Sequence, residues 1–294
     1  MSTRRYSFEA IGTHWDIQIN QALSDKAWTN LQEKIQQRIE VFDATYSRFR
    51  ADSLVSQLAK EAGRYDLPTD GFRMLKLYKQ LYDITDGHVT PLIGQVIADT
   101  GYDADYSLTA KPLQAPPQWA DVITFDERSI TMRTPALLDF GAAGKGCLVD
   151  LVSQLIEQAQ VKHYTVNAGG DIVHRGVAGK PLPVGLENPL DTTEVIGIVE
   201  LSDQSLCASA GSKRTWGDFH HIMNPRTLRP ASGILATWVI ADDTMTADGL
   251  ATALFFCKPA LLAKHFTFSY AVLHQDKQLE YSLNFPATVF GTTQ

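Results

Sequence analysis

Cysteine is scarce in this sequence. The 294 residues contain only Cys147, Cys207 and Cys257, an odd number with no two of them close together. This count and spacing argue against a disulfide framework and against the paired ligands of a zinc site. We therefore expect reduced thiols that are mostly buried.

The sequence also has no apolar run of membrane length, no repeat of fixed period and no low-complexity tract. A formal charge of −7, with 20% charged residues, leaves no basic excess, which argues against nucleic acid as a general partner. The polar N-terminus passes into a strand pattern without the apolar segment of a signal peptide. We expect a cytoplasmic protein that does not insert into membranes.

A chain of 294 residues can bury a full core, in one large domain or in two closely packed ones. We expect a single domain over residues 1–294. Apolar spacing predicts an N-terminal strand pattern over residues 8–19 and helices over 28–42, 72–82, after Lys145, and around 248–256. Residues 101–119 contain three prolines, which indicates a surface connection.

The second half of the chain has several short runs typical of strands, at residues 122–125, 129–132, 164–167, 196–201 and 236–241. Few helices of crossover length separate these runs, which argues against a doubly wound parallel sheet. The sequence therefore predicts an α+β fold, with mixed, largely antiparallel sheets packed by helices.

Residues 138–150 form the most informative segment, because they join an acid, a glycine-rich bend and a lysine. Three glycines let the backbone turn tightly, Lys145 adds a positive charge, and the predicted helix would direct its N-terminus at an anion. The segment lacks the Ser or Thr that follows the lysine of a Walker loop. A glycine-rich turn that only ends a strand is the alternative interpretation.

Asp248 and Thr252 lie four residues apart, so on a helix they share one face. A carboxylate and a hydroxyl in that position suit a hard cation such as Mg²⁺, which prefers oxygen ligands. Alternatively, Asp248 complements the helix dipole and Thr252 only packs.

His220 and His221 precede the segment Ile222–Thr227, and a histidine there suits a general base or a phosphate contact. A hydrogen-bonded structural histidine is the alternative. Residues 167–171, Asn-Ala-Gly-Gly-Asp, suit either the ligand-facing end of a strand or an ordinary turn.

Taken together and in order, these segments resemble the ApbE family of FAD:protein FMN transferases. Residues 138–150 match its Asp-Leu-Gly-x-x-x-Lys-Gly-Tyr motif, and residues 221–230 match its His-Ile-x-Asp-Pro-x-Thr-Gly-x-Pro motif. The other collinear matches are at residues 11–15, 46–53, 86–94, 167–171 and 247–254.

The resemblance implies Mg²⁺ as cofactor, FAD as substrate, and transfer of the FMN half of FAD to a threonine or serine of a target protein, with release of AMP. The implied metal ligands are Asp248, Thr252 and the backbone carbonyl of Ala142, and His221 is the candidate base. The implied FAD contacts are Ile11, Phe49, His88, Val89, Thr90, Asp139, Lys145 and Met223.

The chain departs from the family pattern at several positions. Thr90 and Asn224 replace aspartates, Cys147 replaces a tyrosine, Leu228 replaces a glycine, and residues 208–210 read Ala-Ser-Ala in place of Thr-Ser-Gly. These changes bear on flavin orientation and target recognition. The residues of the implied reaction are retained at Asp139, Lys145, His221, Asp248 and Thr252.

Two other functions fit the same residues. Without an acceptor, water could cleave FAD to FMN and AMP, which would make the chain a pyrophosphate hydrolase. A chain that has lost turnover would be a flavin-binding or assembly protein. The transferase is favoured because a binding protein has no evident need for both metal side chains.

Overall fold

The chain begins with a tight hairpin. In the computed structural model, which describes residues 3–176 and 180–290, strands β1 (Arg4–Ala10) and β2 (Thr13–Ile19) pair antiparallel. The single strand pattern expected over residues 8–19 is therefore two strands. Ile11 and Gly12 both have positive φ, 44° and 73°, and reverse the chain between them.

This hairpin forms one edge of an eight-stranded sheet with the order β1-β2-β6-β7-β10-β15-β16-β17, in which every pairing is antiparallel. The further strands are β6 (Tyr164–Ala168), β7 (Asp171–Arg175), β10 (Ser205–Ala210), β15 (Ile234–Ala241), β16 (Ser269–His274) and β17 (Leu279–Tyr281). The predicted strands at 164–167 and 236–241 correspond to β6 and β15, which lie inside this sheet on either side of β7 and β10.

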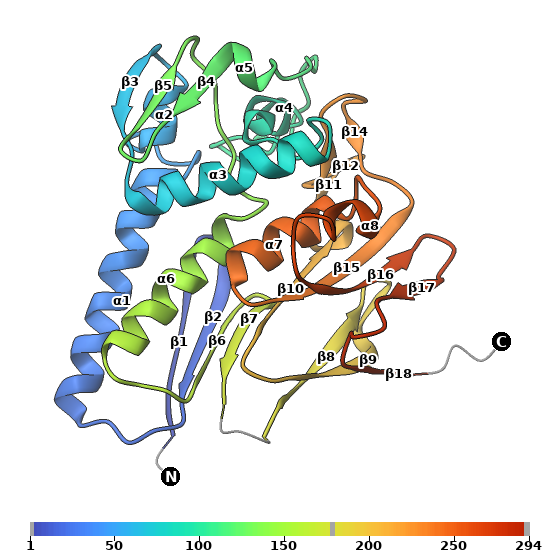
Figure 1. The fold of residues 1–294 in the computed structure, drawn as a ribbon. Coiled ribbons are helices and arrows are strands. Elements are labelled where there is room, and N and C mark those ends of the chain that lie inside the picture. Colours follow the sequence, from blue (N-terminus) through green and yellow to red (C-terminus); the bar gives the residue numbers. More distant parts are fainter. Residues whose placement is uncertain (1–2, 177–179, 291–294) are drawn as a thin grey trace.

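Helices cover one face of this sheet (Figure 1). Helices α6 (Gly144–Gln158) and α7 (Thr244–Ala253) pack directly on the strands, and α1 (Asp25–Tyr46) packs against α6. Helix α3 (Thr69–Ile84) lies over α6 and α7, and the short α8 (Pro259–Leu262) follows α7. Their apolar sides form the main core with Val239 and Cys207, which alternate along their strands with residues of the opposite face. The helices predicted over 28–42 and 72–82 lie within α1 and α3.

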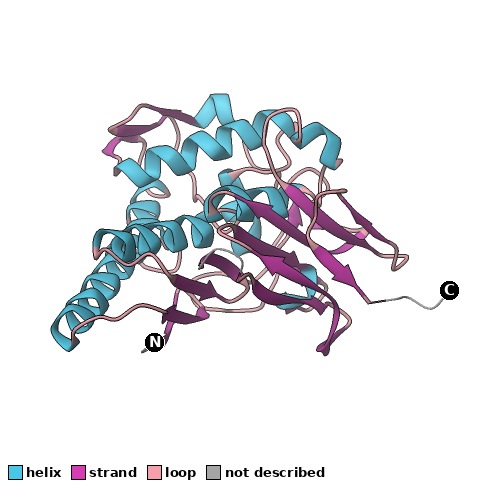
Figure 2. Cartoon of the chain, turned by 60° about the horizontal axis from the view of Figure 1, so that its bottom comes forward, coloured by secondary structure: helices cyan, strands magenta, loops and turns pink. Residues whose placement is uncertain are grey.

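The opposite face packs on a second sheet, ordered β18-β9-β8 and visible from below in Figure 2. Its strands are β8 (Leu182–Asn188), β9 (Asp191–Leu201) and β18 (Ala287–Val289). Leu206, Trp238 and Ile240 join Leu186 and Val199 in a separate apolar cluster between the two sheets. The main sheet is thus buried on both faces over β7, β10, β15 and β16.

Smaller elements complete the fold. They are α2 (Leu54–Leu58), β3 (Gly63–Asp66), η1 (Pro91–Ile93), α4 (Gly94–Asp99), α5 (Trp119–Val122), β4 (Ile123–Phe125), β5 (Ser129–Met132), η2 (Gly211–Lys213), β11 (Thr215–Trp216), β12 (Phe219–His220), β13 (Met223–Asn224) and β14 (Arg229–Pro230). Residues 101–118 contain no helix or strand, as their prolines predicted.

The α+β prediction is confirmed: helices pack on antiparallel sheets. One boundary differs in a way that matters for the site. Helix α7 begins at Thr244, capped by the Asp243 side chain, so Asp248 lies in its second turn and is only 4% exposed. Asp248 is therefore not a solvent-facing acid of the first turn. Of the helices in residues 3–176 and 180–290, none is long and apolar enough to span a membrane.

Candidate active site

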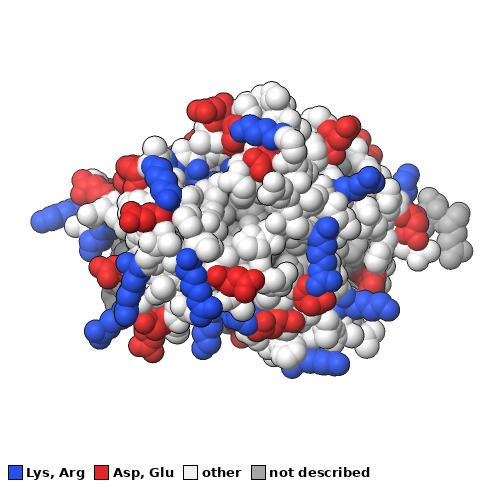
Figure 3. All heavy atoms as spheres, turned by 90° about the horizontal axis from the view of Figure 1, so that it is seen from above, with Lys and Arg blue, Asp and Glu red and all other residues white. Residues whose placement is uncertain are grey.

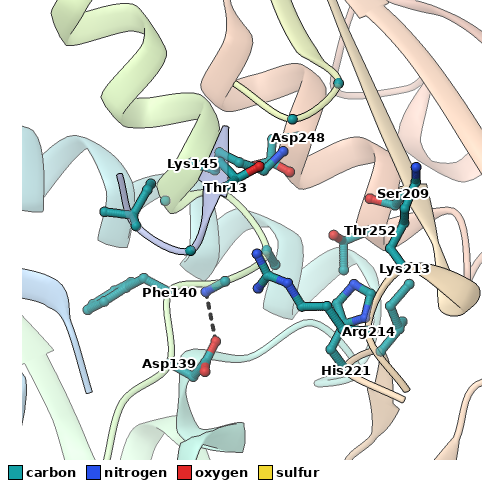
Figure 4. A pocket seen from close by; sticks show the side chains of 18 of the residues that line it. Thr13, Asp139, Phe140, Lys145, Ser209, Lys213, Arg214, His221, Asp248 and Thr252 are labelled. Atoms are coloured by element: carbon teal, nitrogen blue, oxygen red, sulfur yellow. Dashed lines mark hydrogen bonds between the residues drawn. The ribbon is translucent and has the colours of Figure 1, made fainter. Parts of the chain in front are cut away.

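A cavity of about 1480 Å³ lies where the β1–β2 turn, the end of α1, the glycine-rich turn, α7 and the segment after β10 meet. Figure 4 shows its walls at close range. All of the residues proposed from the sequence line it: Ile11, Phe49, His88, Val89, Thr90, Asp139, Ala142, Lys145, His221, Met223, Asp248 and Thr252. Segments more than 200 residues apart in the chain thus share one cavity.

The glycine-rich turn is held against α7 through the backbone of Gly146. Its N–H donates to Oδ2 of Asp248 at 2.9 Å. A methyl group at Gly146 would overlap the Thr244 carbonyl and lie 2.8 Å from Cβ of Asp248, so only glycine permits this approach. The bend observed in the sequence therefore joins two helices at the site.

Helix α7 presents Asp248 and Thr252 one turn apart on one face. Its first turn is fixed by Asp150 of α6, whose carboxylate accepts hydrogen bonds from the N–H groups of Thr244 and Met245, each at 2.9 Å. Burial and the charge of Asp243 raise the pKa of Asp150 to about 6. This contact sets the position of α7 relative to α6.

Three oxygen atoms at this wall make no hydrogen bond within the described residues: the Ala142 carbonyl, Oδ1 of Asp248 and the Thr252 hydroxyl. The Ala142 carbonyl would normally accept from Gly146 N–H, but that group donates to Asp248 instead. Burial and the charge of Asp171 raise the pKa of Asp248 well above its ordinary value. The donor set of carboxylate, hydroxyl and carbonyl oxygens fits a hard divalent cation.

Lys145 lines the cavity and is paired within the chain. Its ammonium forms an ion pair with Asp171, which is completely buried at the start of β7, while the Lys145 side chain is 21% exposed. Burial acts to lower the pKa of Lys145, but the charges of Asp171 and Asp248 outweigh it and raise the pKa. The lysine first compensates carboxylates of its own chain.

Asp139 is oriented by Arg48, an arginine of the matched segment 46–53 that was not among the candidate site residues. Nε of Arg48 donates to Oδ2 of Asp139 at 2.7 Å, and Nη1 donates to the Tyr102 carbonyl at 2.7 Å. The guanidinium also lies 4.2 Å from the centroid of the Phe49 ring. Arg48 therefore links the loop at Phe49 to the glycine-rich turn.

An aromatic wall surrounds this arginine. Phe49 stacks on Tyr106 with ring centroids 5.4 Å apart, and Tyr102 stacks on Trp216 at 4.8 Å. Phe49, Tyr102 and Tyr106 line the cavity. Flat apolar faces beside a polar floor suit a ligand with planar rings and a charged linker.

His221 follows the β11–β12 hairpin, and its N–H donates to the Arg214 carbonyl at 3.2 Å. Burial and the positive charge of Arg214 lower the pKa of His221 to about 4, so the ring is neutral near pH 7. Its Nδ1 is buried without a hydrogen-bond partner among the described residues. A neutral imidazole facing the cavity can accept a proton.

Two of the remaining candidate residues have structural contacts as well. The Thr90 hydroxyl accepts from Leu92 N–H at 3.2 Å and caps η1, and the His88 ring stacks on Phe256 at 5.7 Å. Thr90 is only 5% exposed. The threonine that replaces the aspartate of the family pattern is thus used to begin a helix.

Sequence reasoning missed Arg48 and Arg214 and assigned no role to Asp171. Signals existed for Asp171, which ends the Asn-Ala-Gly-Gly-Asp segment, and for Arg48, which lies within the matched segment 46–53. Arg214 lies in a segment whose local pattern indicates no ligand. Only the fold brings it to the cavity.

Comparison with known proteins places the chain among sequences and structures of one family. The sequence model of the ApbE family matches residues 11–268. The FAD:protein FMN transferase of Haemophilus influenzae is 27% identical over 277 residues, covering 85% of this chain and 79% of that protein.

Solved structures share the fold. The flavin transferase ApbE from Vibrio cholerae superposes with a TM-score of 0.80 at 22% identity, over 97% of this chain and 98% of that one. The ApbE protein from Thermotoga maritima gives a TM-score of 0.82 at 20% identity, over 96% and 97% of the two chains.

Proposed function

This chain belongs to the ApbE family, and from that premise we propose that it transfers the FMN part of FAD to a threonine or serine hydroxyl of a target protein, with AMP as the second product. We further propose that the reaction depends on Mg²⁺. The chain is then a transferase with FAD as its substrate.

The observation that carries the proposal is the set of three unengaged oxygens beside the glycine-rich turn. The Ala142 carbonyl, Asp248 Oδ1 and Thr252 hydroxyl line the cavity and make no hydrogen bond within the described residues. They would hold Mg²⁺, which supplies neutralisation of diphosphate charge and activation of its phosphorus towards attack. A buried carboxylate beside a second one, Asp171, also favours a cation there.

The proposed reaction exchanges one oxygen–phosphorus bond for another. The acceptor hydroxyl oxygen attacks the phosphorus of the FMN half, and the bond from that phosphorus to the oxygen of the AMP half breaks. His221, neutral and lining the cavity, takes the hydroxyl proton. AMP leaves with the bond electrons.

The residues around the cavity supply the positioning. Arg48 holds Asp139 and the Phe49 ring in fixed relation, and Asp150 holds the start of α7. Ordered groups of this kind lower the entropy that the reaction must lose on the way to its transition state. The single domain over residues 1–294 and the cytoplasmic location stay predictions from the sequence.

Labelling of an acceptor tests the proposal. The purified chain is incubated with FAD, MgCl₂ and a recombinant flavoprotein subunit that receives FMN from an ApbE enzyme, and covalent flavin is read as in-gel fluorescence with AMP measured by chromatography. We expect labelling and AMP in equal amounts. Asp248→Asn should lower the rate by about 100-fold or more because the metal ligand loses its charge.

Asp242→Asn is the matched control, since Asp242 is an exposed aspartate just before the same helix. It should label as the unaltered chain does. Labelling that persists at full rate in EDTA would contradict the metal proposal. FMN and AMP released without labelled acceptor would identify a hydrolase instead, and FAD bound without AMP release would identify a binding protein.

A further inference from the structure

Beside the glycine-rich turn the cavity is lined by Lys145 and Asp248. The Lys145 ammonium interacts with two carboxylates: it forms an ion pair with the buried Asp171, and the charge of Asp248 also acts on it. A diphosphate that entered here would be repelled by the Asp248 carboxylate, and the neighbouring Lys145 is already paired with Asp171. One divalent cation offsets part of this repulsion, and a further cation from the protein would complete the compensation.

Arg214 has the position of such a cation. Its side chain starts after η2 on one wall of the cavity, and a methyl group placed on Gly12 of the opposite β1–β2 turn would lie 4.0 Å from its Nη2. Figure 4 shows the side chain reaching into the middle of the cavity. The Arg214 guanidinium is therefore exposed to the cavity and not to the outer surface alone.

The neighbouring Lys213 has an ion-pair partner, whereas Arg214 has none among the described residues. Lys213 Nζ pairs with Glu187 of β8 at 2.5 Å. Arg214 makes no ion pair and donates no side-chain hydrogen bond within residues 3–176 and 180–290. Of these two adjacent cations, Arg214 keeps its donors available for a ligand.

The backbone that carries Arg214 is fixed. Trp216, two residues later, is buried, donates from Nε1 to the Thr100 carbonyl at 2.9 Å and stacks on Tyr102. The Arg214 carbonyl accepts from His221 N–H, which ties the arginine to the candidate base. A fixed backbone reduces the entropy lost when the side chain orders on a ligand.

We propose that Arg214 binds the diphosphate of the flavin nucleotide and stabilises the negative charge that the departing AMP phosphate acquires. The inference rests on the proposed function for the identity of the ligand. The planar guanidinium places two parallel N–H groups on phosphate oxygens, which a lysine cannot reproduce. Charge that develops during bond breaking is stabilised most by donors already in place.

Binding of two flavins separates a phosphate contact from a structural role. Dissociation constants of FAD and of riboflavin, which lacks phosphate, are measured with MgCl₂ present by quenching of flavin fluorescence. Arg214→Ala should weaken FAD binding by about 10-fold or more, in line with a charged hydrogen bond, and leave riboflavin binding within about twofold. Arg214→Lys should fall between, and added guanidinium chloride should restore part of the FAD affinity of Arg214→Ala.

Lys213→Ala is the control for charge alone, and we expect it to change FAD affinity by less than about twofold because that ammonium is already paired and exposed. Equal losses for FAD and riboflavin in Arg214→Ala, or unchanged FAD binding, would overturn the proposal. A raised KM for the acceptor protein with normal FAD binding in Arg214→Ala would also overturn it, because Arg214 would then contact the target protein. If the unaltered chain binds FAD without transferring FMN, the proposed function fails while the binding comparison still tests Arg214.

Discussion

Lys145 and Asp171 form a buried ion pair within a group of three charges. Asp171 is completely buried, and Asp248 adds a second carboxylate near the same ammonium. Taking these charges out of water is unfavourable unless each is compensated. The pair therefore contributes to the fold as well as to the site.

Removal of Lys145 alone should show how much the stability of the fold depends on this ion pair. Lys145→Met leaves two carboxylates without their cation, and we expect a loss of about 3 kcal/mol in the free energy of unfolding measured in urea. The double variant Lys145→Met, Asp171→Asn should recover at least about 1 kcal/mol of that loss, since the uncompensated charge of Asp171 is gone. Lys79→Met, which breaks an exposed pair with Asp83, is the control and should lose no more than about 0.5 kcal/mol. Additive losses would show that Lys145 and Asp171 do not interact.

The neutral state of His221 predicts how stability depends on pH. Burial and the Arg214 charge lower the pKa of His221 from its ordinary 6.5 to about 4, so the folded chain binds fewer protons here than the unfolded chain between these values. The stabilisation is present above the unfolded pKa and is lost as the pH falls through the window. Between pH 7 and pH 5 we expect this group to remove about 2 kcal/mol of unfolding free energy.

Urea denaturation of His221→Gln at both pH values measures this contribution. Between pH 7 and pH 5, the free energy of unfolding of the variant should fall by about 2 kcal/mol less than that of the unaltered chain. His265→Gln, at an exposed histidine, should keep the unaltered pH dependence. The same loss in His221→Gln as in the unaltered chain would contradict the assignment.

At the scale of elements, the contact between α6 and α7 decides the geometry of the site. Gly146 is the point of closest approach, and its N–H holds Asp248. Asp243 caps α7, and Asp150 of α6 binds the first two amides of α7. Helix propensity alone would produce both helices but not this approach.

A single methyl group tests the approach. Gly146→Ala would collide with the Thr244 backbone, and we expect it to destabilise the chain by about 1–3 kcal/mol and to impair FMN transfer, because α7 must move. Gly144→Ala is the matched control in the same turn, since its methyl would meet Phe140 Cβ at 3.4 Å. It should be neutral or slightly stabilising, given the helix propensity of alanine. Equal effects of the two substitutions in thermal unfolding and labelling assays would argue against a special contact at Gly146.

At the scale of the molecule, the cavity joins segments from both ends of the chain. Its wall runs from the β1–β2 turn to α7, and Figure 3 shows acidic and basic side chains interspersed on the upper face of the molecule. No cluster of charges of one sign dominates that face.

Ligand binding to a cavity built this way should stabilise the whole fold. FAD and MgCl₂ at about 100 times their dissociation constants should add about 2.7 kcal/mol, which corresponds to a rise in Tm of roughly 5 °C for a chain of this size. EDTA should remove most of this rise, and Asp248→Asn should show little of it. A rise in Tm that is the same with and without metal, followed by differential scanning fluorimetry, would contradict a shared metal and FAD site.

Local patterns predicted much of the fold. Helical spacing identified α1 and α3, short strand-like runs identified β6 and β15 of the main sheet, and prolines identified the surface connection expected over 101–119, of which 101–118 has no helix or strand. The N-terminal hairpin was missed because its turn is formed by a non-glycine residue with positive φ, Ile11, followed by Gly12. The start of α7 was misplaced because its cap, Asp243, lies beyond the motif that drew attention to Asp248.

The sequence by itself determined the residue types of the site and their order, and every candidate residue lines one cavity. Only the tertiary structure decided their partners. Lys145 pairs with Asp171, Arg48 with Asp139 91 residues away, and Gly146 with Asp248 102 residues away. Spacing along a chain reports neighbours within one helix or strand, whereas ion pairs between elements depend on how those elements pack. For that reason the ion pair of Lys145 with the buried Asp171 and the position of Arg214 at the cavity could not be predicted from the sequence.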